Sequence, residues 1–134
     1  MKTRAGGTFD VTLAPLPTSD TSEGSPLARM SIDKQFHGDL NATSAGEMLA
    51  AGTAVKGSAG YVAIERVTGS LQGRTGSFVL QHSATMTRGA PELSIIVVPD
   101  SGTGELAGLS GRMGITITDG KHYYEFEYAI TSTP

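Results

Sequence analysis

The sequence predicts a single all-β domain, a single antiparallel β-barrel of about eight strands. Apolar side chains alternate with polar ones along many short segments, which is the period of a half-buried strand. Glycine supplies 18 of the 134 residues, too many for a helical bundle because glycine destabilises helix interiors. A chain of this length forms one domain around one core, so residues 1–134 are assigned to a single unit.

The first strand is predicted at Thr8–Leu13, where every second residue is apolar. Residues 14–26 are rich in Pro, Ser, Thr, Asp and Gly, and they are predicted to form a solvated loop. The alternation then returns and continues to Gly38, where the strand is interrupted or turns. One face of this second strand carries Ala28, Met30, Ile32, Lys34 and Phe36.

The segment Ser44–Ala51 is compatible with two structures. Ser44 and Glu47 match a helix capping box ahead of an apolar run. A helix ended by Gly52 would be barely two turns long, which is too short to be stable without tertiary packing. An extended strand is therefore the favoured interpretation.

Five later segments carry the clearest strand patterns, each bounded by glycine or proline. They are Tyr61–Val67, Ser77–Thr87, Leu93–Val98, Met113–Thr118 and His122–Ile130. Between the last two, Asp119 and Gly120 form the dipeptide that tight hairpin turns favour, because such turns need positive φ angles. The sequence thus predicts a hairpin at this point.

A glycine pattern, Gly-x-Leu-x-Gly-x-x-Gly, begins at Gly69 and again at Gly104, and a shorter echo begins at Gly38. Closing a sheet into a barrel brings strands so near each other that a side chain at some positions would collide with the facing strand. We expect the repeated glycines to serve this structural role; flexible surface loops are the alternative.

Composition and charge exclude several classes of protein. The net charge of −3 argues against nucleic acid as a partner, because phosphate backbones are bound by clusters of Lys and Arg. With no cysteine, the chain has no disulfide, no thiolate metal site and no Cys nucleophile. No segment has the apolar core of a signal peptide or the length of a membrane helix, so we expect a cytoplasmic protein without a membrane partner.

Two predicted strands are apolar on both faces, and these are Tyr61–Val67 and the run from Ser94 to Val98. A strand of this kind is buried on both sides. Since the outer face of a lone barrel meets water, we expect part of the exterior to pack against another subunit or a terminal segment. The protein is therefore predicted to be a homo-oligomer.

The inner faces of two strands combine aromatic side chains with a histidine, as expected of a pocket for a small, mostly apolar ligand. With residues from nearby strands, the candidate ligand-binding residues are Tyr61, Phe78, Leu80, Glu105, His122, Tyr124 and Tyr128. Glu105 is included because it lies in a glycine-rich segment whose backbone N–H groups are expected to be free. No cofactor is expected.

Glu65 and His82 are the candidate catalytic residues. Glu65 lies on an apolar strand, where burial would raise its pKa and suit it to acid or base chemistry. Alternatively it forms a structural ion pair with an arginine, for which Arg66, Arg74 and Arg112 are the candidates. His82 is alternatively a core histidine satisfied by hydrogen bonds. A metal site is not expected, because the three histidines occupy separate strands without paired spacing.

Two long segments carry a resemblance to a known family. They run from Gly57 through Glu65 to His82, and from Val98 through Pro99 and Gly102 to Gly108. Over about Gly7 to Ile130 the chain resembles the domain-of-unknown-function 3224 family of uncharacterised bacterial proteins. The resemblance implies an allene-oxide-cyclase-like or lipocalin-like barrel and carries over no shared activity.

The stretch from Gly102 to Gly111 is also similar to the glycine-rich strand entry of allene oxide cyclases and plant dirigent proteins. Those barrels bind apolar ligands and steer cyclisation or coupling. No match to the other ligand-binding segment of the cyclases is recognised in this chain.

Three functions remain open from the sequence. The leading hypothesis is a barrel that binds a small apolar or aromatic molecule, oriented by His82, His122, Tyr124 and Tyr128. The second is an isomerase or cyclase in which Glu65 or His82 moves a proton. The third is a structural oligomer whose barrel is filled by its own side chains.

Overall fold

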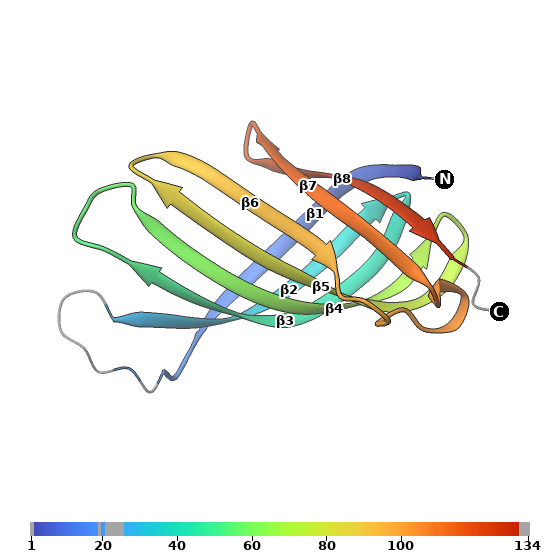
Figure 1. Ribbon diagram of the computed structural model, residues 1–134, viewed down its shortest axis with the longest axis horizontal. Coiled ribbons are helices and arrows are strands. Elements are labelled where there is room, and N and C mark those ends of the chain that lie inside the picture. The colour runs from blue at the N-terminus through green and yellow to red at the C-terminus, as the bar shows by residue number, and fades with distance from the viewer. Residues whose placement is uncertain (1, 19, 21–25, 132–134) are drawn as a thin grey trace.

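The structure, a computed structural model, describes residues 2–18, 20 and 26–131, and it contains eight strands closed into one antiparallel barrel (Figure 1). The strands are β1 (Thr3–Leu16), β2 (Leu27–Gly38), β3 (Leu40–Gly52), β4 (Ala59–Leu71), β5 (Arg74–Thr87), β6 (Ala90–Val97), β7 (Leu109–Thr118) and β8 (Lys121–Ile130). A short 3₁₀ turn, η1 (Gly104–Leu106), precedes β7. The predicted all-β barrel is confirmed.

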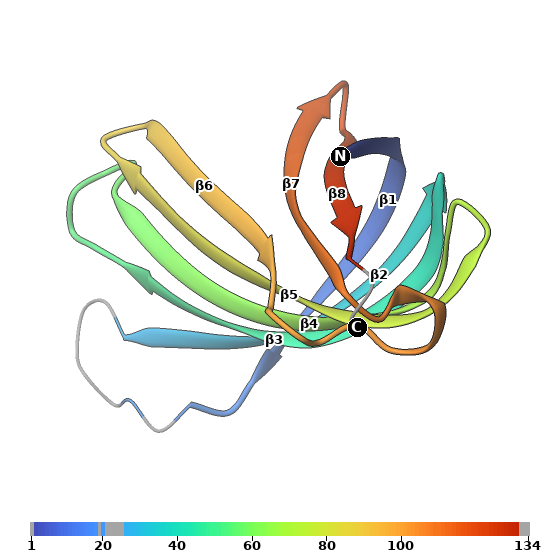
Figure 2. The same cartoon turned by 45° about the vertical axis from the view of Figure 1, so that its right-hand side comes forward.

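Each strand pairs with the next along the chain, and β1 closes the barrel against β8. One seam is much weaker than the others. Strands β6 and β7 share a single paired position, Ile96 opposite Arg112. Figure 2 shows these two strands diverging from each other toward the β6 hairpin. The barrel is therefore flared at this end.

The segment Ser44–Ala51 is part of β3, so the favoured strand is confirmed. The hairpin at Asp119 and Gly120 is confirmed as well, since both residues have positive φ, 51° and 77°, and join β7 directly to β8. A short helix at Ser44 would have left β2 and β4 without a partner between them.

The prediction that residues 14–26 form a loop is wrong at its start. Ala14 to Leu16 extend β1, where Pro15 pairs with Met30 of β2. On the other side β1 pairs with β8 only as far as Phe9, so Pro15 has no second neighbour that needs its missing N–H. Residues 19 and 21–25 of the predicted loop lie outside the described part of the chain.

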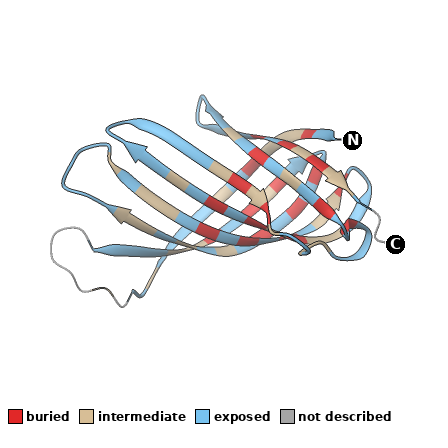
Figure 3. Cartoon of the chain, in the orientation of Figure 1, coloured by how far each residue is buried: buried red, intermediate tan, exposed pale blue. Residues whose placement is uncertain are grey.

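The interior is packed toward one end of the barrel and accessible toward the other (Figure 3). The end called here the closed half is filled by buried inward side chains, which include Phe36, Leu40, Leu71, Phe78, Leu80, Tyr124, Phe126 and Tyr128. Leu106 of η1 is also buried and covers this end.

The opposite end is called here the open half. Its inward positions are still apolar, yet solvent reaches them: Leu13 is 46% exposed, Met86 43%, Leu93 44% and Ile117 63%. These positions lie on β1, β5, β6 and β7, and the last three strands form or adjoin the weakly paired seam. Their exposure shows that the side chains of the barrel do not fill its open half.

The outer face of β3 and β4 exposes apolar side chains, as the two-sided pattern of Tyr61–Val67 predicts. Val62 is 55% exposed and Ile64 50%. With Leu49 they line a shallow outer groove of about 510 Å³. Contact with a second subunit at this face stays a prediction. No helix in the described part of the chain is long and apolar enough to cross a membrane.

Glycines allow close strand approach at two points. A Cβ on Gly69 would lie 2.3 Å from the carbonyl oxygen of Asn41. On Gly46 of β3, which faces Glu65 of β4, it would lie 2.0 Å from the Ile64 carbonyl oxygen and 2.6 Å from the Glu65 Cα. Backbone atoms cannot move aside as a flexible side chain can, so these positions exclude larger residues. The structural role expected for the glycine at Gly69 is confirmed.

Substitution of Gly46 tests this close approach. We expect Gly46→Ala to lower the free energy of unfolding by about 2–3 kcal/mol, because the new methyl group forces β3 away from β4. Gly114 of β7 is the matched control, since a Cβ there meets no atom within 4 Å. Gly114→Ala should change stability by less than about 0.5 kcal/mol in urea unfolding. Equal effects of the two substitutions would contradict the steric explanation.

Candidate functional site

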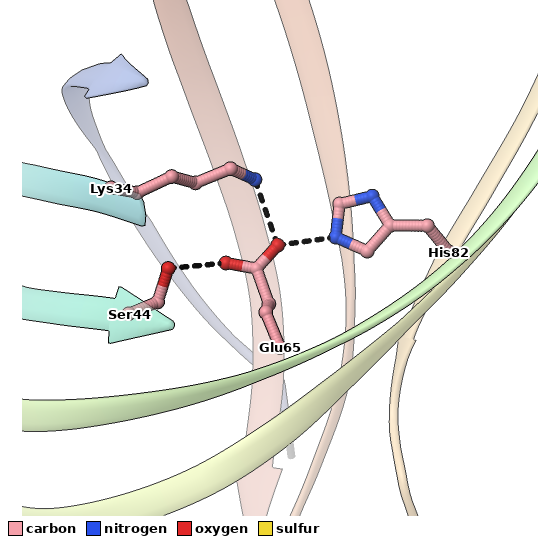
Figure 4. A network of polar contacts seen from close by, with 4 residues as sticks. All are labelled: Lys34, Ser44, Glu65 and His82. Atoms are coloured by element: carbon pink, nitrogen blue, oxygen red, sulfur yellow. Dashed lines mark hydrogen bonds and ion pairs between the residues drawn. The ribbon is translucent and has the colours of Figure 1, made fainter. Parts of the chain in front are cut away.

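Glu65 is the centre of a buried polar cluster inside the barrel (Figure 4). Its Oε2 atom lies 2.8 Å from Lys34 Nζ and 2.5 Å from His82 Nε2, and its Oε1 atom accepts a hydrogen bond of 2.7 Å from Ser44 Oγ. The four side chains come from four consecutive strands, β2 to β5. They are all buried, and Glu65 is completely so.

The cluster lies directly on the aromatic packing of the closed half. Lys34 Nζ is 4.9 Å from the ring centroid of Phe9 and 5.7 Å from that of Phe36. Ring faces attract a cation, so the lysine is held by both its carboxylate partner and these rings. The Glu65 cluster therefore marks the boundary between the packed and the open parts of the interior.

Glu65 carries a negative charge at neutral pH. Burial alone raises the pKa of this carboxyl, but the hydrogen bond from His82, the charge and hydrogen bond of Lys34 and the hydrogen bond from Ser44 together lower it to about 2. The expectation that burial would leave Glu65 with a raised pKa is wrong. Its oxygens are occupied as acceptors, so Glu65 does not exchange protons near pH 7.

Glu65 does form an ion pair, as the alternative interpretation predicts, but its partner is not an arginine. Arg66, Arg74 and Arg112 are all exposed, whereas Lys34 forms the pair. The sequence did contain a signal for Lys34, since it is the one charged residue on the apolar face of its strand. Sequence reasoning had no means to tell which strand would lie near Glu65.

One ring nitrogen of His82 is hydrogen-bonded to Glu65, and the other is free. Because Glu65 is ionised and acts only as an acceptor, Nε2 of His82 carries the proton of their hydrogen bond. In the neutral imidazole, Nδ1 then presents a lone pair. Nδ1 has no hydrogen-bond partner among the described residues. Every side-chain nitrogen or oxygen of these residues that is sealed from solvent does have a partner, so Nδ1 is in contact with solvent even though His82 as a whole is only 4% exposed. His82 is thus an acceptor available to a small molecule.

Tyr61 is a further predicted site residue near the His82 ring. Its ring centroid lies 6.3 Å from that of His82, and the ring is half-buried on the inward face of β4. Burial, and after it the charge of Glu65, raises the pKa of the Tyr61 hydroxyl. The structure therefore brings Glu65, His82 and Tyr61 together.

Four other predicted ligand-binding residues lie in the closed half instead. Phe78 stacks on Phe126 at 5.8 Å, and Leu80 is completely buried. The Tyr124 hydroxyl donates to the His37 carbonyl oxygen at 2.9 Å and accepts from the Leu40 N–H at 2.8 Å.

The Tyr128 hydroxyl bonds to Gln72. Both tyrosine hydroxyls are thus used to tie strand ends together, and the structure does not bring Phe78, Tyr124 or Tyr128 to the site. Leu80 lies opposite Glu65 in the β4–β5 ladder, but its side chain is completely buried.

The last two predicted residues are also apart from Glu65. His122 faces inward from β8, half-buried, with its ring centroid 5.1 Å from that of Phe9. Glu105 is exposed, and its carboxylate accepts a hydrogen bond of 3.0 Å from the Thr75 N–H, so it holds the η1 segment against β5. The described residues contain no group of three side chains placed to hold a metal ion.

Comparison with other proteins places the chain among relatives without an assigned role. The model of a family described as proteins of unknown function, DUF3224, matches residues 5–128. A crystal structure of a protein with unknown function from the DUF3224 family of Shewanella oneidensis MR-1 is 53% identical in sequence. It matches with a TM-score of 0.94 over 98% of this chain and 100% of that one. No curated protein matches.

Replacement of Lys34 tests the buried ion pair. We expect Lys34→Met to reduce the free energy of unfolding by about 3–5 kcal/mol, because it leaves an uncompensated buried carboxylate. The double variant Lys34→Met/Glu65→Gln should recover most of this loss, since no charge is then buried. Urea unfolding of both variants measures the difference. If the double variant is no more stable than Lys34→Met, the electrostatic account of the cluster is wrong.

The cluster also predicts an acid-sensitive fold. The pKa of Glu65 is lowered from 4.5 to about 2 on folding, so its contribution to stability is present above pH 4.5 and is lost as pH falls through 2. Thermal unfolding followed from pH 6 to pH 2 should show a smaller decline for Lys34→Met/Glu65→Gln than for the native chain. Identical declines would show that other carboxylates cause the acid sensitivity.

Proposed function

Because the chain belongs to the DUF3224 family of proteins of unknown function, we propose a function from its own chemistry: the open half of the barrel binds a small, largely apolar molecule that carries one polar group. The observation that carries this proposal is the free Nδ1 of His82 beside inward apolar side chains that solvent reaches. Ligand sites combine an apolar wall with few polar groups in this way.

The apolar wall supplies the affinity in this proposal. Displacing water from inward side chains such as Leu13, Leu93 and Ile117, which are 44–63% exposed, is favourable at about 25 cal/mol per Å². The weak seam between β6 and β7 supports access to these side chains from outside. In a purely structural barrel, the protein's own side chains would be expected to cover this apolar inner face.

In this proposal, Nδ1 of His82 orients the bound molecule. Because the ionised Glu65 holds a proton on Nε2, Nδ1 of the neutral imidazole accepts hydrogen bonds and does not donate them. A ligand that carries a hydroxyl group satisfies Nδ1, and an ether or hydrocarbon of the same shape leaves it without a partner. The site is therefore expected to favour a small aromatic or alicyclic alcohol over its ether.

A matched pair of aromatic probes tests the proposal. We expect 2-naphthol to bind about tenfold more tightly than 2-methoxynaphthalene, which corresponds to one hydrogen bond to a buried acceptor. His82→Leu should abolish this preference while both probes still bind. Fluorescence titration measures the four dissociation constants. If neither probe binds the native chain, the proposed function is wrong.

A second pair of variants locates the binding site. Ala84 faces inward on β5, opposite Tyr61 and Leu93, so Ala84→Trp places a large ring in the open half. We expect it to weaken 2-naphthol binding at least about tenfold, because the ring occupies the site. Its neighbour Ser83 is exposed and lines the outer groove, so Ser83→Trp adds the same ring outside and should leave the affinity unchanged. The reverse result would place the ligand in the outer groove.

A further inference from the structure

Two polar groups are left without partners on the inward face of neighbouring strands. One is Nδ1 of His82 on β5, and the other is the hydroxyl of Tyr61 on β4, for which the described residues provide no hydrogen bond. Their rings lie 6.3 Å apart, centroid to centroid. A molecule bound in the open half meets both, one as a proton acceptor and one as a proton donor.

Tyr61 is suited to donate a hydrogen bond without losing its proton. Desolvation by burial and the nearby charge of Glu65 both raise the pKa of its hydroxyl, so the phenol stays neutral across the physiological range. A neutral donor stabilises negative charge that develops on a substrate oxygen, most strongly where the bound substrate has displaced water from the donor.

His82 is suited to accept a proton. When Nδ1 is protonated, the positive charge of the imidazolium is stabilised by the Glu65 carboxylate 2.5 Å from Nε2. The ionisable groups around it are Glu65 and Tyr61 of β4 and Lys34 of β2, while Ile95 of β6 is its uncharged opposite neighbour. Lys34 balances the charge of Glu65 before reaction, so the cluster as a whole becomes cationic only when His82 takes up the proton.

We infer that the open half catalyses enolisation of small apolar ketones, with His82 as the base and Tyr61 as the oxyanion donor. Nδ1 takes the proton from the carbon next to the carbonyl. The electron pair of that C–H bond forms a carbon–carbon double bond, and the π pair of the carbonyl moves onto its oxygen, which accepts the Tyr61 hydrogen bond. The imidazolium then returns a proton to carbon.

The reaction class follows from where the proton returns. Return to the same carbon exchanges hydrogen with solvent, and return to a conjugated carbon of an unsaturated ketone moves its double bond. No oxidant, reductant or metal takes part. The inference rests on the proposed function, because the ketone must first bind in the open half, and it specifies the substrate as a carbonyl compound with an acidic C–H bond.

Glu65 does not touch the substrate in this scheme. It is a positioning residue that keeps the proton of neutral His82 on Nε2 and so leaves Nδ1 free. Glu65 stays ionised during both proton transfers, in agreement with the three hydrogen bonds that its carboxylate accepts.

Hydrogen exchange into 2-tetralone tests the inference, since this bicyclic ketone has an acidic C–H bond and an apolar body. In deuterium oxide the native chain should accelerate deuterium uptake at the carbon between the ring and the carbonyl. His82→Gln should reduce the accelerated rate by about 10²–10⁴-fold, as expected for loss of a general base. Tyr61→Phe should reduce it by about 10²-fold, as expected for loss of one oxyanion donor.

The pH profile separates a chemical role of His82 from a structural one. The pH dependence of the native rate should differ from that of the residual rate of His82→Gln. His37 is the control histidine, because it is exposed on the outside and pairs with Asp10. His37→Gln should exchange deuterium at the native rate.

The dissociation constant of 2-tetralone, measured by ligand-observed NMR for each variant, distinguishes failure of the inference from failure of the proposed function. Binding with exchange that depends on both His82 and Tyr61 supports the inference. Binding without accelerated exchange, or exchange that survives His82→Gln, overturns it and leaves the binding function intact. Absence of binding to the native chain overturns both.

Discussion

A carboxylate enclosed in a β-barrel has to find its hydrogen bonds and its countercharge on other strands. Glu65 obtains them from Lys34 on β2, Ser44 on β3 and His82 on β5. Taking an ion out of water costs several kcal/mol, and these contacts together offset that cost. They therefore constrain how β2, β3, β4 and β5 are arranged around the axis.

This constraint lies where the packing of the barrel changes. Below the Glu65 cluster, the closed half is filled by Phe36, Phe78, Tyr124 and their neighbours, and tyrosine hydroxyls bind backbone groups at the strand ends. Above it, inward side chains remain apolar but are no longer covered, and the ladder between β6 and β7 is reduced to one paired position. The closed half gives the fold its stability, and the open half gives it an accessible inner surface.

A buried ion pair contributes little to stability compared with apolar side chains of the same volume. The chain nevertheless holds a buried ion pair at the boundary between the closed and the open half. This pair has an effect on His82 that apolar side chains would not have. It keeps Glu65 ionised, and an ionised Glu65 determines which nitrogen of His82 bears the proton. The free nitrogen, on a ring whose centroid lies 6.3 Å from that of Tyr61, is the product of this arrangement, and it is the feature on which both proposals rest.

The sequence by itself determined the architecture, because the alternation of side chains indicates most of the strands, and the inward face of many of them, before any contact is known. It placed Glu65, His82 and Tyr61 on inner faces, and Lys34 on the apolar face of its strand. It also gave the two-residue turn at Asp119 and Gly120, since that turn is a local property of the dipeptide.

Only the tertiary structure decided which inward residues meet. Register and the stagger of the strands around the barrel bring Lys34 to Glu65 and carry Tyr124 and Tyr128 to the packed end, and neither quantity is encoded in the period of a single strand. The direction in which the pKa of Glu65 shifts also depends on the tertiary structure. Burial raises the pKa and hydrogen bonds lower it, so the sign depends on partners that come from three other strands.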